Sequence, residues 1–472
     1  MTSLQTSRPH FHFTPPQHWI NDPNGLVYFD GEWHLFYQHN PFGSEWGHMS
    51  WGHAVSRDLA HWEHLPLALP EQADYMIFSG SAAVDWHNSG GFGDGIHPPL
   101  IAAYTAHSPR EQTQHLAFSR DRGRTWTPYS GNPVVAIGSR EFRDPKLFWH
   151  APSGRWVMAC ALADRQQVRL YGSSNLREWR HLSDFGPAGA ATGAWECPDL
   201  FPLSVEDDPA QQRWVLKVDD QRFGAQYFIG DFDGERFTCD DPPDVARRVD
   251  FGRDFYAAQS WNDAPEGRRV WLAWMSHWDY AAQTPTAPWR GMMSAPRELT
   301  LRADGGRLCL AQQPARELRS LRRAHWHIAQ VSCDEANDRL RTLSVRGTAL
   351  EIAATFVGTT GDAFGLKVRT GTAEETIIGY SAAEGLLVVD RSRSGDVSFS
   401  PRFDARHAAP CPLRDGALTI HVLVDAHSVE VFADGGRLVI SDLIFPQPES
   451  DGIAIFGAAG ARVQSLDVWE LA

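Results

Sequence analysis

Three acidic residues in this chain lie in short segments whose composition could hold a carboxylate in the fixed orientation that catalysis requires. Asp22 lies in the sequence WINDPNG, Asp144 in EFRDP and Glu196 in WECPD. Proline fixes its own φ and pushes the preceding residue toward an extended backbone, so a carboxylate close to proline is oriented at low entropic cost. A pair of such carboxyl groups suits glycosyl transfer, in which one protonates the leaving oxygen and the other attacks the sugar.

Each segment also has an ordinary structural interpretation. The residues around Asp22 are good turn formers, Asp144 could pair with Arg143 inside a turn, and Glu196 could simply end a strand. Together the three favour catalysis, because little serine, cysteine or metal chemistry surrounds them. Cys197 adjoins Glu196 but has no indicated histidine partner, so we do not expect it to be a nucleophile.

Composition excludes several classes of protein. The chain has 472 residues, enough for about two or three domains, and no apolar stretch reaches the ~20 residues that cross a bilayer. Its net charge of −15 and the lack of a basic run argue against nucleic acid and membrane partners. The six cysteines form no CxxC pair and the 21 histidines no HExxH motif, so we expect no metal and no cofactor. Residues 1–10 have no apolar core for a secretory signal, so we expect a cytoplasmic protein, or a secreted one if a signal has been removed.

The elements that must position these residues follow a repeating strand–turn–strand pattern. Trp33, Trp156, Trp214 and Trp271 open the second strands of similar hairpins. They recur at multiples of about 60 residues, with one copy hidden near residues 100–104. Over about 310 residues this period predicts five blades of a β-propeller, in which the three acidic residues can converge on the central axis. The alternative is an irregular β-sandwich with coincidental tryptophan spacing.

The pattern changes near residue 312. The polar segment 313–324 is predicted to be a short helical linker. Beyond it, residues 325–472 show the alternation of polar and apolar residues seen in Leu418–Val424, which indicates an antiparallel β-sandwich. The predicted fold is therefore all-β, with a five-bladed propeller over residues 1–312 followed by a C-terminal β-sandwich.

Six short segments, in order along the chain, form a specific combined signature. They are WINDPNG at residues 19–25, FYQHNP at 36–41, WGHA at 51–54, FSGS at 78–81, FRDP at 142–145 and WECPDL at 195–200. Together they resemble glycoside hydrolase family 32, the invertase, inulinase and levanase group, and the likeness runs from His12 to the C-terminus. The resemblance implies a five-bladed propeller with a β-sandwich that acts on terminal β-fructofuranosyl units.

The resemblance also implies roles for individual residues. Asp22 would be the nucleophile, Glu196 the acid/base, and Asp144 the residue that holds fructose hydroxyls and stabilises the transition state. A retaining reaction needs Asp22 ionised and Glu196 protonated at the start, with the two carboxyl groups about 5–5.5 Å apart. The implied substrate-binding residues are Asn21, Gln38, Trp46, Phe78, Ser79, Arg143 and Trp278.

Later segments resemble the exo-acting inulinase and levanase branch, which releases fructose from non-reducing ends. They are FYAAQSW at residues 255–261 and the run 274–299, which contains WDY and WRG. Residues 217–226, on the leaving-group side in that branch, form a shorter loop than the glycine-rich one typical there. The expected partner is a small-molecule or oligosaccharide fructoside, such as sucrose or a fructo-oligosaccharide, while the preference for the polymers inulin and levan stays open.

Three other activities remain open from the sequence. A fructosyltransferase would use the same site with a sugar acceptor in place of water. A propeller enzyme that cleaves arabinosides or xylosides would share three carboxylates but invert the configuration. A non-catalytic propeller would bind sugar without turnover.

Overall fold

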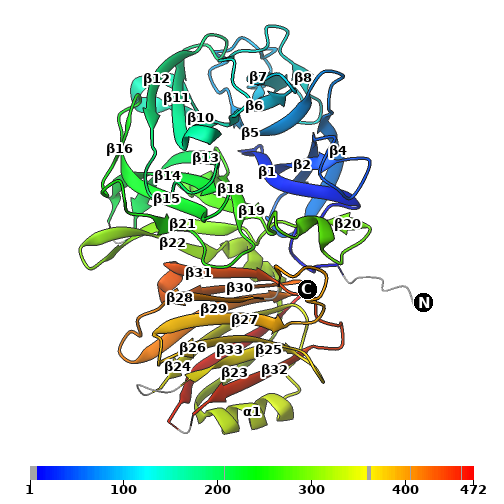
Figure 1. Ribbon diagram of the computed structural model, residues 1–472, viewed down its shortest axis with the longest axis vertical. Helices are drawn as coiled ribbons and strands as arrows, with labels where there is room; N and C mark the ends of the chain where they lie inside the picture. The colour runs from blue at the N-terminus through cyan, green and yellow to red at the C-terminus, as the bar shows by residue number, and fades with distance from the viewer. Residues whose placement is uncertain (1–7, 207, 359–362, 404, 459) are drawn as a thin grey trace.

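Two β domains, stacked end to end, make up the molecule (Figure 1). The computed structural model describes residues 8–206, 208–358, 363–403, 405–458 and 460–472. In the view of Figure 1 the N-terminal domain is a ring of blades above the C-terminal domain. Among the described residues, no helix combines the length and the apolar composition needed to cross a membrane.

The N-terminal domain is a five-bladed propeller, counted over the described part of residues 8–314. The first blade contains β1 (His18–Phe29), β2 (Glu32–Asn40), β3 (Ser50–Ser56) and β4 (Trp62–Leu69), with β20 (Trp289–Arg290) added beside β1. The second contains β5 (Met76–Val84), β6 (Leu100–His107), β7 (Gln112–Ser119) and β8 (Thr127–Pro128). The third contains β9 (Phe142–His150), β10 (Arg155–Leu162), β11 (Gln167–Ser173) and β12 (Arg180–Phe185).

The fourth and fifth blades share one sheet, because Val205 pairs with Leu301. The fourth contains β13 (Trp195–Val205), β14 (Asp208–Asp220), β15 (Gly224–Phe232) and β16 (Phe237–Cys239), with β17 (Arg247–Arg248) paired to β15. The fifth contains β18 (Tyr256–Ser260), β19 (Val270–Trp274), β21 (Arg297–Asp304) and β22 (Arg307–Pro314).

The predicted tryptophan period is the period of the blades. Trp33, Trp156, Trp214 and Trp271 lie in β2, β10, β14 and β19, each the second strand of its blade. The hidden copy near residues 100–104 is β6, the second strand of the second blade. The five-bladed propeller is confirmed, and the irregular sandwich is excluded for this half of the chain.

The C-terminal domain is a sandwich of two antiparallel sheets. Apolar side chains from both inner faces form its core, among them Ile352, Leu366 and Val422. One sheet has the order β23 (Arg322–Ser332), β33 (Arg462–Leu471), β24 (Leu350–Val357), β29 (Ala417–Asp425), β30 (Ser428–Ala433) and β31 (Leu438–Leu443). The other has the order β28 (Arg406–Pro410), β27 (Leu386–Arg393), β26 (Glu375–Ser381), β25 (Ala363–Thr370) and β32 (Gly452–Gly457). The C-terminal β-sandwich predicted from the alternating pattern is confirmed.

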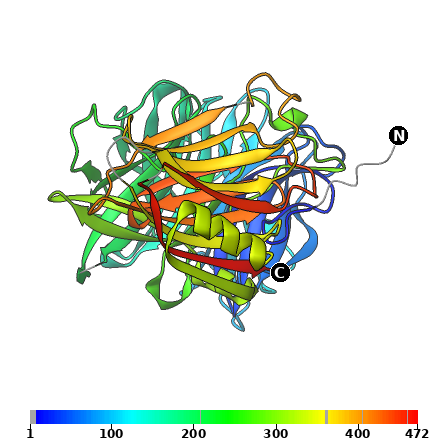
Figure 2. The ribbon, with the colours of Figure 1, turned by 90° about the horizontal axis from the view of Figure 1, so that it is seen from below.

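Helical structure is sparse and occupies connections. Helix α1 (Cys333–Thr342) lies at the end of the sandwich remote from the propeller (Figures 1 and 2), and Ser332 and Glu335 form its capping box. The segment expected as a linker contains the end of β22, then η5, then the start of β23, and Leu318 and Leu321 of η5 are buried. The 3₁₀ helices are η1 (Ala151–Ser153), η2 (Ala163–Arg165), η3 (Pro265–Gly267), η4 (Ala281–Gln283), η5 (Arg316–Leu321) and η6 (Asp434–Gly436).

Buried ion pairs join the two domains. Arg297 of β21 donates from Nη2 to Oε2 of Glu430 in β30 (2.5 Å), and a second propeller residue, Asp250, accepts from Nη1 of the same arginine (3.0 Å). Arg391 of β27 donates from Nη1 to Oδ2 of Asp254 (2.5 Å). Removing one member of such a pair leaves an uncompensated buried charge, so these contacts fix how the domains meet.

Candidate active site

The first strand of each blade carries a bulge near the end where the predicted catalytic residues lie. In β1, Asn21 and Asp22 together lie opposite the single residue Gln38. In β9, Asp144 and Pro145 occupy the corresponding bulge. A bulge bends its strand and redirects a side chain, and bulges are common beside active sites.

The same irregularity recurs in the remaining first strands. It falls at Ser79 in β5, at Cys197 directly after Glu196 in β13, and at Ala257 in β18. The backbone is left-handed at three of the bulges, with φ of 63° at Asp144, 49° at Cys197 and 56° at Ala257. Such a conformation costs about 1–3 kcal/mol for a residue other than glycine, so the surrounding fold must hold it in place.

The expectation that proline holds these residues on an extended backbone is wrong for Asp144. Asp144 directly precedes Pro145, yet its φ is positive. Its backbone N–H donates to Oγ1 of Thr105 (3.0 Å), and the carbonyl oxygen of Pro145 accepts from Oγ of Ser81 (2.7 Å). Both partners belong to the second blade, so contacts between blades override the local preference set by proline.

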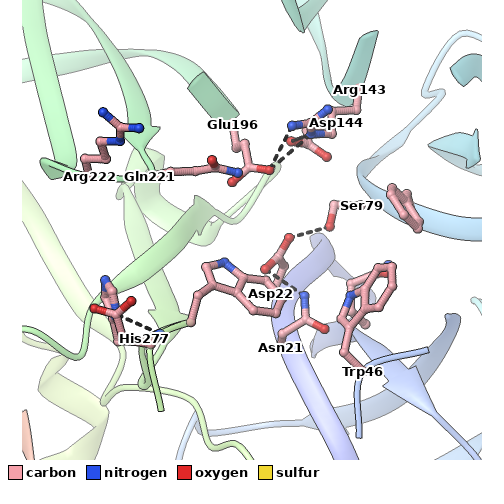
Figure 3. Close-up of a pocket in the computed structure, with 14 residues that line it drawn as sticks. Asn21, Asp22, Trp46, Ser79, Arg143, Asp144, Glu196, Gln221, Arg222 and His277 are labelled. Carbon is pink, nitrogen blue, oxygen red and sulfur yellow. Dashed lines mark hydrogen bonds and ion pairs between the residues drawn. The ribbon is translucent and has the colours of Figure 1, made fainter. Parts of the chain in front are cut away.

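All ten residues predicted for the site line one pocket of about 470 Å³ at this end of the propeller axis (Figure 3). Strands β1, β9 and β13 each contribute one of the three carboxylates. The ten residues are Asn21, Asp22, Gln38, Trp46, Phe78, Ser79, Arg143, Asp144, Glu196 and Trp278.

Asp22 is held at both carboxylate oxygens. Oδ1 accepts from Nδ2 of Asn21 (2.9 Å) and Oδ2 accepts from Oγ of Ser79 (2.6 Å), as Figure 3 shows. Asn21 is itself oriented, because Nε1 of Trp19 donates to its Oδ1 (2.8 Å). Burial raises the pKa of Asp22, the two hydrogen bonds oppose this, and the charge of Glu196 raises it further. The result is a fixed, poorly solvated carboxylate that is suited to nucleophilic attack.

Arg143 is the cation that faces the other two carboxylates. It donates to Oε1 of Glu196 from Nε (3.2 Å) and Nη2 (3.0 Å), and its Nε lies 4.0 Å from Oδ2 of Asp144. Glu141 and Gln112 fix the guanidinium through Nη1, at 2.6 and 3.3 Å. Arg143 therefore has a defined position between two strands that carry carboxylates.

The charge of Arg143 does not fully compensate Asp144. Burial raises the pKa of Asp144 to about 7, Arg143 lowers it, and the charges of Glu196 and Asp22 raise it further. The same guanidinium also pairs with Glu196 and Glu141. Carboxyl groups under such conditions are typical of catalytic sites.

Glu196 has a second donor that the sequence analysis did not identify. The hydroxyl of Tyr256 in β18 donates to Oε2 of Glu196 (2.5 Å), while Arg143 donates to Oε1. Burial keeps the pKa of Tyr256 well above its ordinary value, so the phenol remains a donor. Tyr256 lies within residues 255–261, but nothing in that sequence indicates that it contacts a residue 60 positions earlier.

The Cys197 thiol is buried beside the carboxylates and lacks the features of a nucleophile. Burial raises the pKa of Cys197 well above its ordinary value, so the reactive thiolate is not favoured. Its backbone N–H donates to Oδ2 of Asp144 (2.9 Å), and its Sγ lies 3.5 Å from Oδ2 of Asp22. Cys197 therefore packs against the two aspartates and fixes Asp144.

Four further residues line the pocket and were not predicted: Gln221, Arg222, His277 and Asp279. Gln221 and Arg222 lie between β14 and β15, in the segment 217–226 already associated with the leaving-group side. Asp279 follows Trp278. The sequence indicated these segments but not the residues, because the path of each loop decides which side chains face the pocket.

The wall of the pocket is supported by the C-terminal domain. Oδ1 of Asp279 accepts from Nη1 of Arg402 (2.7 Å), and its Oδ2 accepts from Nη2 of Arg253 (2.6 Å). Arg402 belongs to the connection between β27 and β28 of the sandwich. The sandwich thus contacts a residue of the pocket directly.

The fold and the site together define a class of protein. Carboxylates, guanidinium, amide and hydroxyl groups, and flat aromatic faces meet at the axis of a propeller, and such a set of groups suits a glycoside hydrolase. Within the described residues, no group of three or more His, Cys, Asp or Glu side chains is arranged to hold a metal ion.

Comparison with known proteins identifies the family. The model of the glycosyl hydrolases family 32 N-terminal domain matches residues 12–314, and that of the family 32 C-terminal domain matches residues 317–470. This chain therefore belongs to glycoside hydrolase family 32. It is 45% identical to a levanase of Bacillus subtilis (strain 168), over 98% of this chain and 70% of that protein.

Solved structures agree over the whole chain. The structure of an exo-inulinase from Aspergillus awamori matches with a TM-score of 0.90 and 33% identity, over 99% of both chains. A β-fructofuranosidase from Schwanniomyces occidentalis, solved with fructosyl-erythritol, matches with a TM-score of 0.89 and 30% identity, over 100% of this chain and 99% of that one.

Proposed function

We propose that this protein is a retaining β-fructosidase that hydrolyses terminal, non-reducing β-D-fructofuranosyl residues of sucrose and fructans. The convergence of Asp22, Asp144 and Glu196 on one pocket carries this proposal. Family membership supports it, as do relatives that are described as levanase and exo-inulinase. The bound ligands of solved relatives, among them fructose, 1-kestose and sucrose, are of the same chemical class.

In the first step, Asp22 attacks the anomeric carbon of fructose while Glu196 protonates the leaving oxygen. The bond to the leaving group breaks and a fructosyl ester forms on Asp22. Ser79 and Asn21 fix the attacking carboxylate. Asp144 holds fructose hydroxyls and stabilises the positive charge of the transition state.

In the second step, Glu196 takes a proton from water, which attacks the ester and releases fructose with its configuration retained. This step needs Glu196 as an ionised carboxylate, and the groups that donate hydrogen bonds to Glu196 stabilise that form. Tyr256 contacts one oxygen and Arg143 the other, so both stabilise the carboxylate that forms once the leaving group has been protonated. Gln38, Trp46, Phe78 and Trp278 would enclose the fructosyl unit.

The leaving group would lie toward Gln221 and Arg222. Both residues line the pocket from the turn between β14 and β15. Their amide and guanidinium groups can donate to sugar hydroxyls. We infer that this turn determines how the second sugar unit of a fructan is held.

Initial rates on sucrose, 1-kestose, inulin and levan, with NMR of the first-formed anomer, test the proposal. We expect fructose from the non-reducing end as the first product, with the β configuration. An initially inverted anomer would indicate an inverting propeller enzyme instead. Accumulation of trisaccharide at high sucrose would indicate a fructosyltransferase.

A further inference from the structure

The propeller has a second cavity, of about 510 Å³, at the opposite end of its axis from the active site. The placement follows from the first strands. In β5, Ser79 near the start lines the active site, whereas Val84 at the end lines the second cavity. In β9 the same holds for Asp144 and His150.

Buried polar side chains fill the axis between the two cavities. Asn262, which lines the second cavity, donates from Nδ2 to the carbonyl oxygens of Ala82 (2.7 Å) and Leu147 (2.8 Å), in the second half of β5 and β9. Nearby, Nζ of Lys146 lies 2.9 Å from Oδ1 of Asp199. The second cavity is therefore a separate site and not an exit from the active site.

Exposed tryptophans mark both cavities. The most exposed tryptophans of the described residues are Trp86, Trp46 and Trp278, with 57%, 46% and 40% of their surface accessible. Trp46 and Trp278 line the active site, and Trp86 lines the second cavity. A single exposed tryptophan is ordinary, but Trp86 shares its cavity with the partly exposed Trp149 and Trp214, and a larger exposed apolar patch indicates an interaction site.

Trp86 is held in a fixed orientation. Its Nε1 donates to Oδ1 of Asp263 (2.8 Å), and its ring lies 5.8 Å from that of Phe29. Trp149 and Trp214 also line the cavity and are partly exposed. A rigid aromatic face loses little entropy when a flat ligand covers it.

The polar groups of the cavity suit a neutral, hydroxyl-rich ligand. Asp233, Asp263 and Arg269 line it, so its carboxylates outnumber its guanidinium and an anionic ligand is disfavoured. Nε of Arg269 is buried without a hydrogen-bond partner among the described residues, and Gln212 offers an amide. Aromatic faces beside single donors and acceptors are the typical lining of a sugar site.

We propose that this cavity is a second, non-catalytic binding site for a fructan chain, with the sugar stacked on Trp86. The choice of fructan rests on the proposed function of the active site. A polymer held at one end of the propeller raises the local concentration of chain ends near the enzyme. No bond is formed or broken in this cavity.

Binding stoichiometry tests the proposal. In the Glu196→Gln background, in which turnover is strongly slowed, calorimetric titration with 1-kestose should show two equivalents per chain. Adding Trp86→Ala should remove one equivalent, and Trp86→Phe, which keeps an aromatic face, should retain it. Ile96→Ala is the matched control, because Ile96 is 77% exposed in the same connection between β5 and β6 but lines neither cavity.

The proposal would be overturned if Trp86→Ala left the stoichiometry unchanged. It would also be overturned if the Glu196→Gln parent bound only one equivalent and Trp86→Ala did not remove it. Binding of maltotriose, but not of 1-kestose, in a Trp86-dependent manner would overturn it as well. Sucrose hydrolysis by the Trp86→Ala enzyme separates the two proposals. If sucrose turnover is normal and Trp86→Ala does not change the binding stoichiometry, only the proposal of a second site is contradicted. If 1-kestose binds in a Trp86-dependent manner but no substrate is hydrolysed, only the proposed activity is contradicted.

Discussion

Two groups of buried carboxylates in this protein differ in how their charge is compensated. In the active site, Glu196 accepts from Arg143 and Asp144 lies 4.0 Å from the same guanidinium, whereas Asp22 accepts from the neutral groups of Asn21 and Ser79. Burial and mutual repulsion raise the pKa of Asp22, and that of Asp144 to about 7.

At the joint between the domains, Asp425 and Glu430 bracket the ring of His12. His12 Nδ1 lies 2.8 Å from Oδ2 of Asp425, and its Nε2 lies 2.8 Å from Oε1 of Glu430. Arg297 donates to the other oxygen of Glu430. Burial opposes ionisation of Glu430, but Arg297 and His12 lower its pKa to about 2, and hydrogen bonds with His10 and His12 lower that of Asp425 further.

The difference shows how the same residue types serve two purposes. At the joint, cations and hydrogen bonds compensate each charge, so the carboxylates are inert and fix the domains. In the pocket, the compensation is incomplete, so the carboxylates can exchange protons and attack a substrate. Four predictions separate these two roles.

The largest effect should come from the two carboxylates that take part in the reaction. Asp22→Asn should lower kcat/KM for sucrose by roughly 10⁴-fold or more, and Glu196→Gln by about 10²–10⁴-fold, because nucleophile and proton donor are lost. Both variants should unfold at nearly the parental temperature. Initial rates with thermal unfolding check this, and near-parental hydrolysis by either variant would contradict the assigned roles.

Removal of a cation from the joint should destabilise the fold without removing any catalytic group. Arg297→Met leaves Glu430 and Asp250 buried without their shared partner, so we expect a loss of about 3–5 kcal/mol in the free energy of unfolding. Denaturant unfolding measures it. The double variant Arg297→Met/Glu430→Gln should recover part of the loss; no recovery would show that the charge of Glu430 is not the cause.

His12 should make the stability of the joint depend on pH. Burial opposes its charge, but Asp425 and Glu430 raise the pKa of His12 from 6.5 to about 9. Its contribution is complete below pH 6.5 and is lost as pH rises toward 9, by roughly 3 kcal/mol. The ionised carboxylates of Asp425 and Glu430 stabilise the fold above their unfolded pKa values of 3.8 and 4.5, and this stabilisation is lost as pH falls. The free energy of unfolding should therefore be greatest between pH 4.5 and 6.5.

Unfolding free energies from pH 5 to 9 check this expectation. His12→Gln should be less stable at pH 5.5 and should lose less stability between pH 6.5 and 9. His48→Gln is the control, since His48 is exposed and distant from the joint. The same alkaline loss in His12→Gln as in the parent would contradict the assignment.

The smallest effect should come from the point where the sandwich reaches the pocket. Arg402 is largely exposed, and Arg253 still holds Asp279 when Arg402 is removed. Arg402→Ala should therefore change KM for 1-kestose by less than about fivefold, because exposed ion pairs contribute roughly 0.2–1 kcal/mol.

The matched control is Arg406→Ala, which removes an exposed arginine paired with Glu384 elsewhere in the sandwich. It should leave KM unchanged. A drop in kcat for sucrose in Arg402→Ala would show that the sandwich acts on the reacting groups and not only on the wall of the pocket.

The sequence predicted those features of the fold whose physical cause is a local residue pattern. The tryptophans are regularly spaced because each lies in the second strand of its blade: Trp33, Trp156, Trp214 and Trp271. The blades could therefore be counted from the sequence. Alternation in Leu418–Val424 reflects a sheet with one buried face. The three carboxylates stood in short distinctive segments, the resemblance to the family implied the binding residues, and the structure places all ten around one pocket.

Only the tertiary structure decided how those residues are held. The left-handed backbone at Asp144 depends on Thr105 of the neighbouring blade, and the hydrogen bond from Tyr256 to Glu196 depends on the packing of the fifth blade against the fourth. Neither contact leaves a local signal, because each partner satisfies an ordinary strand pattern on its own. The sequence by itself determined the blades, the sandwich and the reactive residue types. Packing between blades and the junction with the sandwich decided which carboxylates are compensated, since charge compensation depends on distances between segments far apart in the chain.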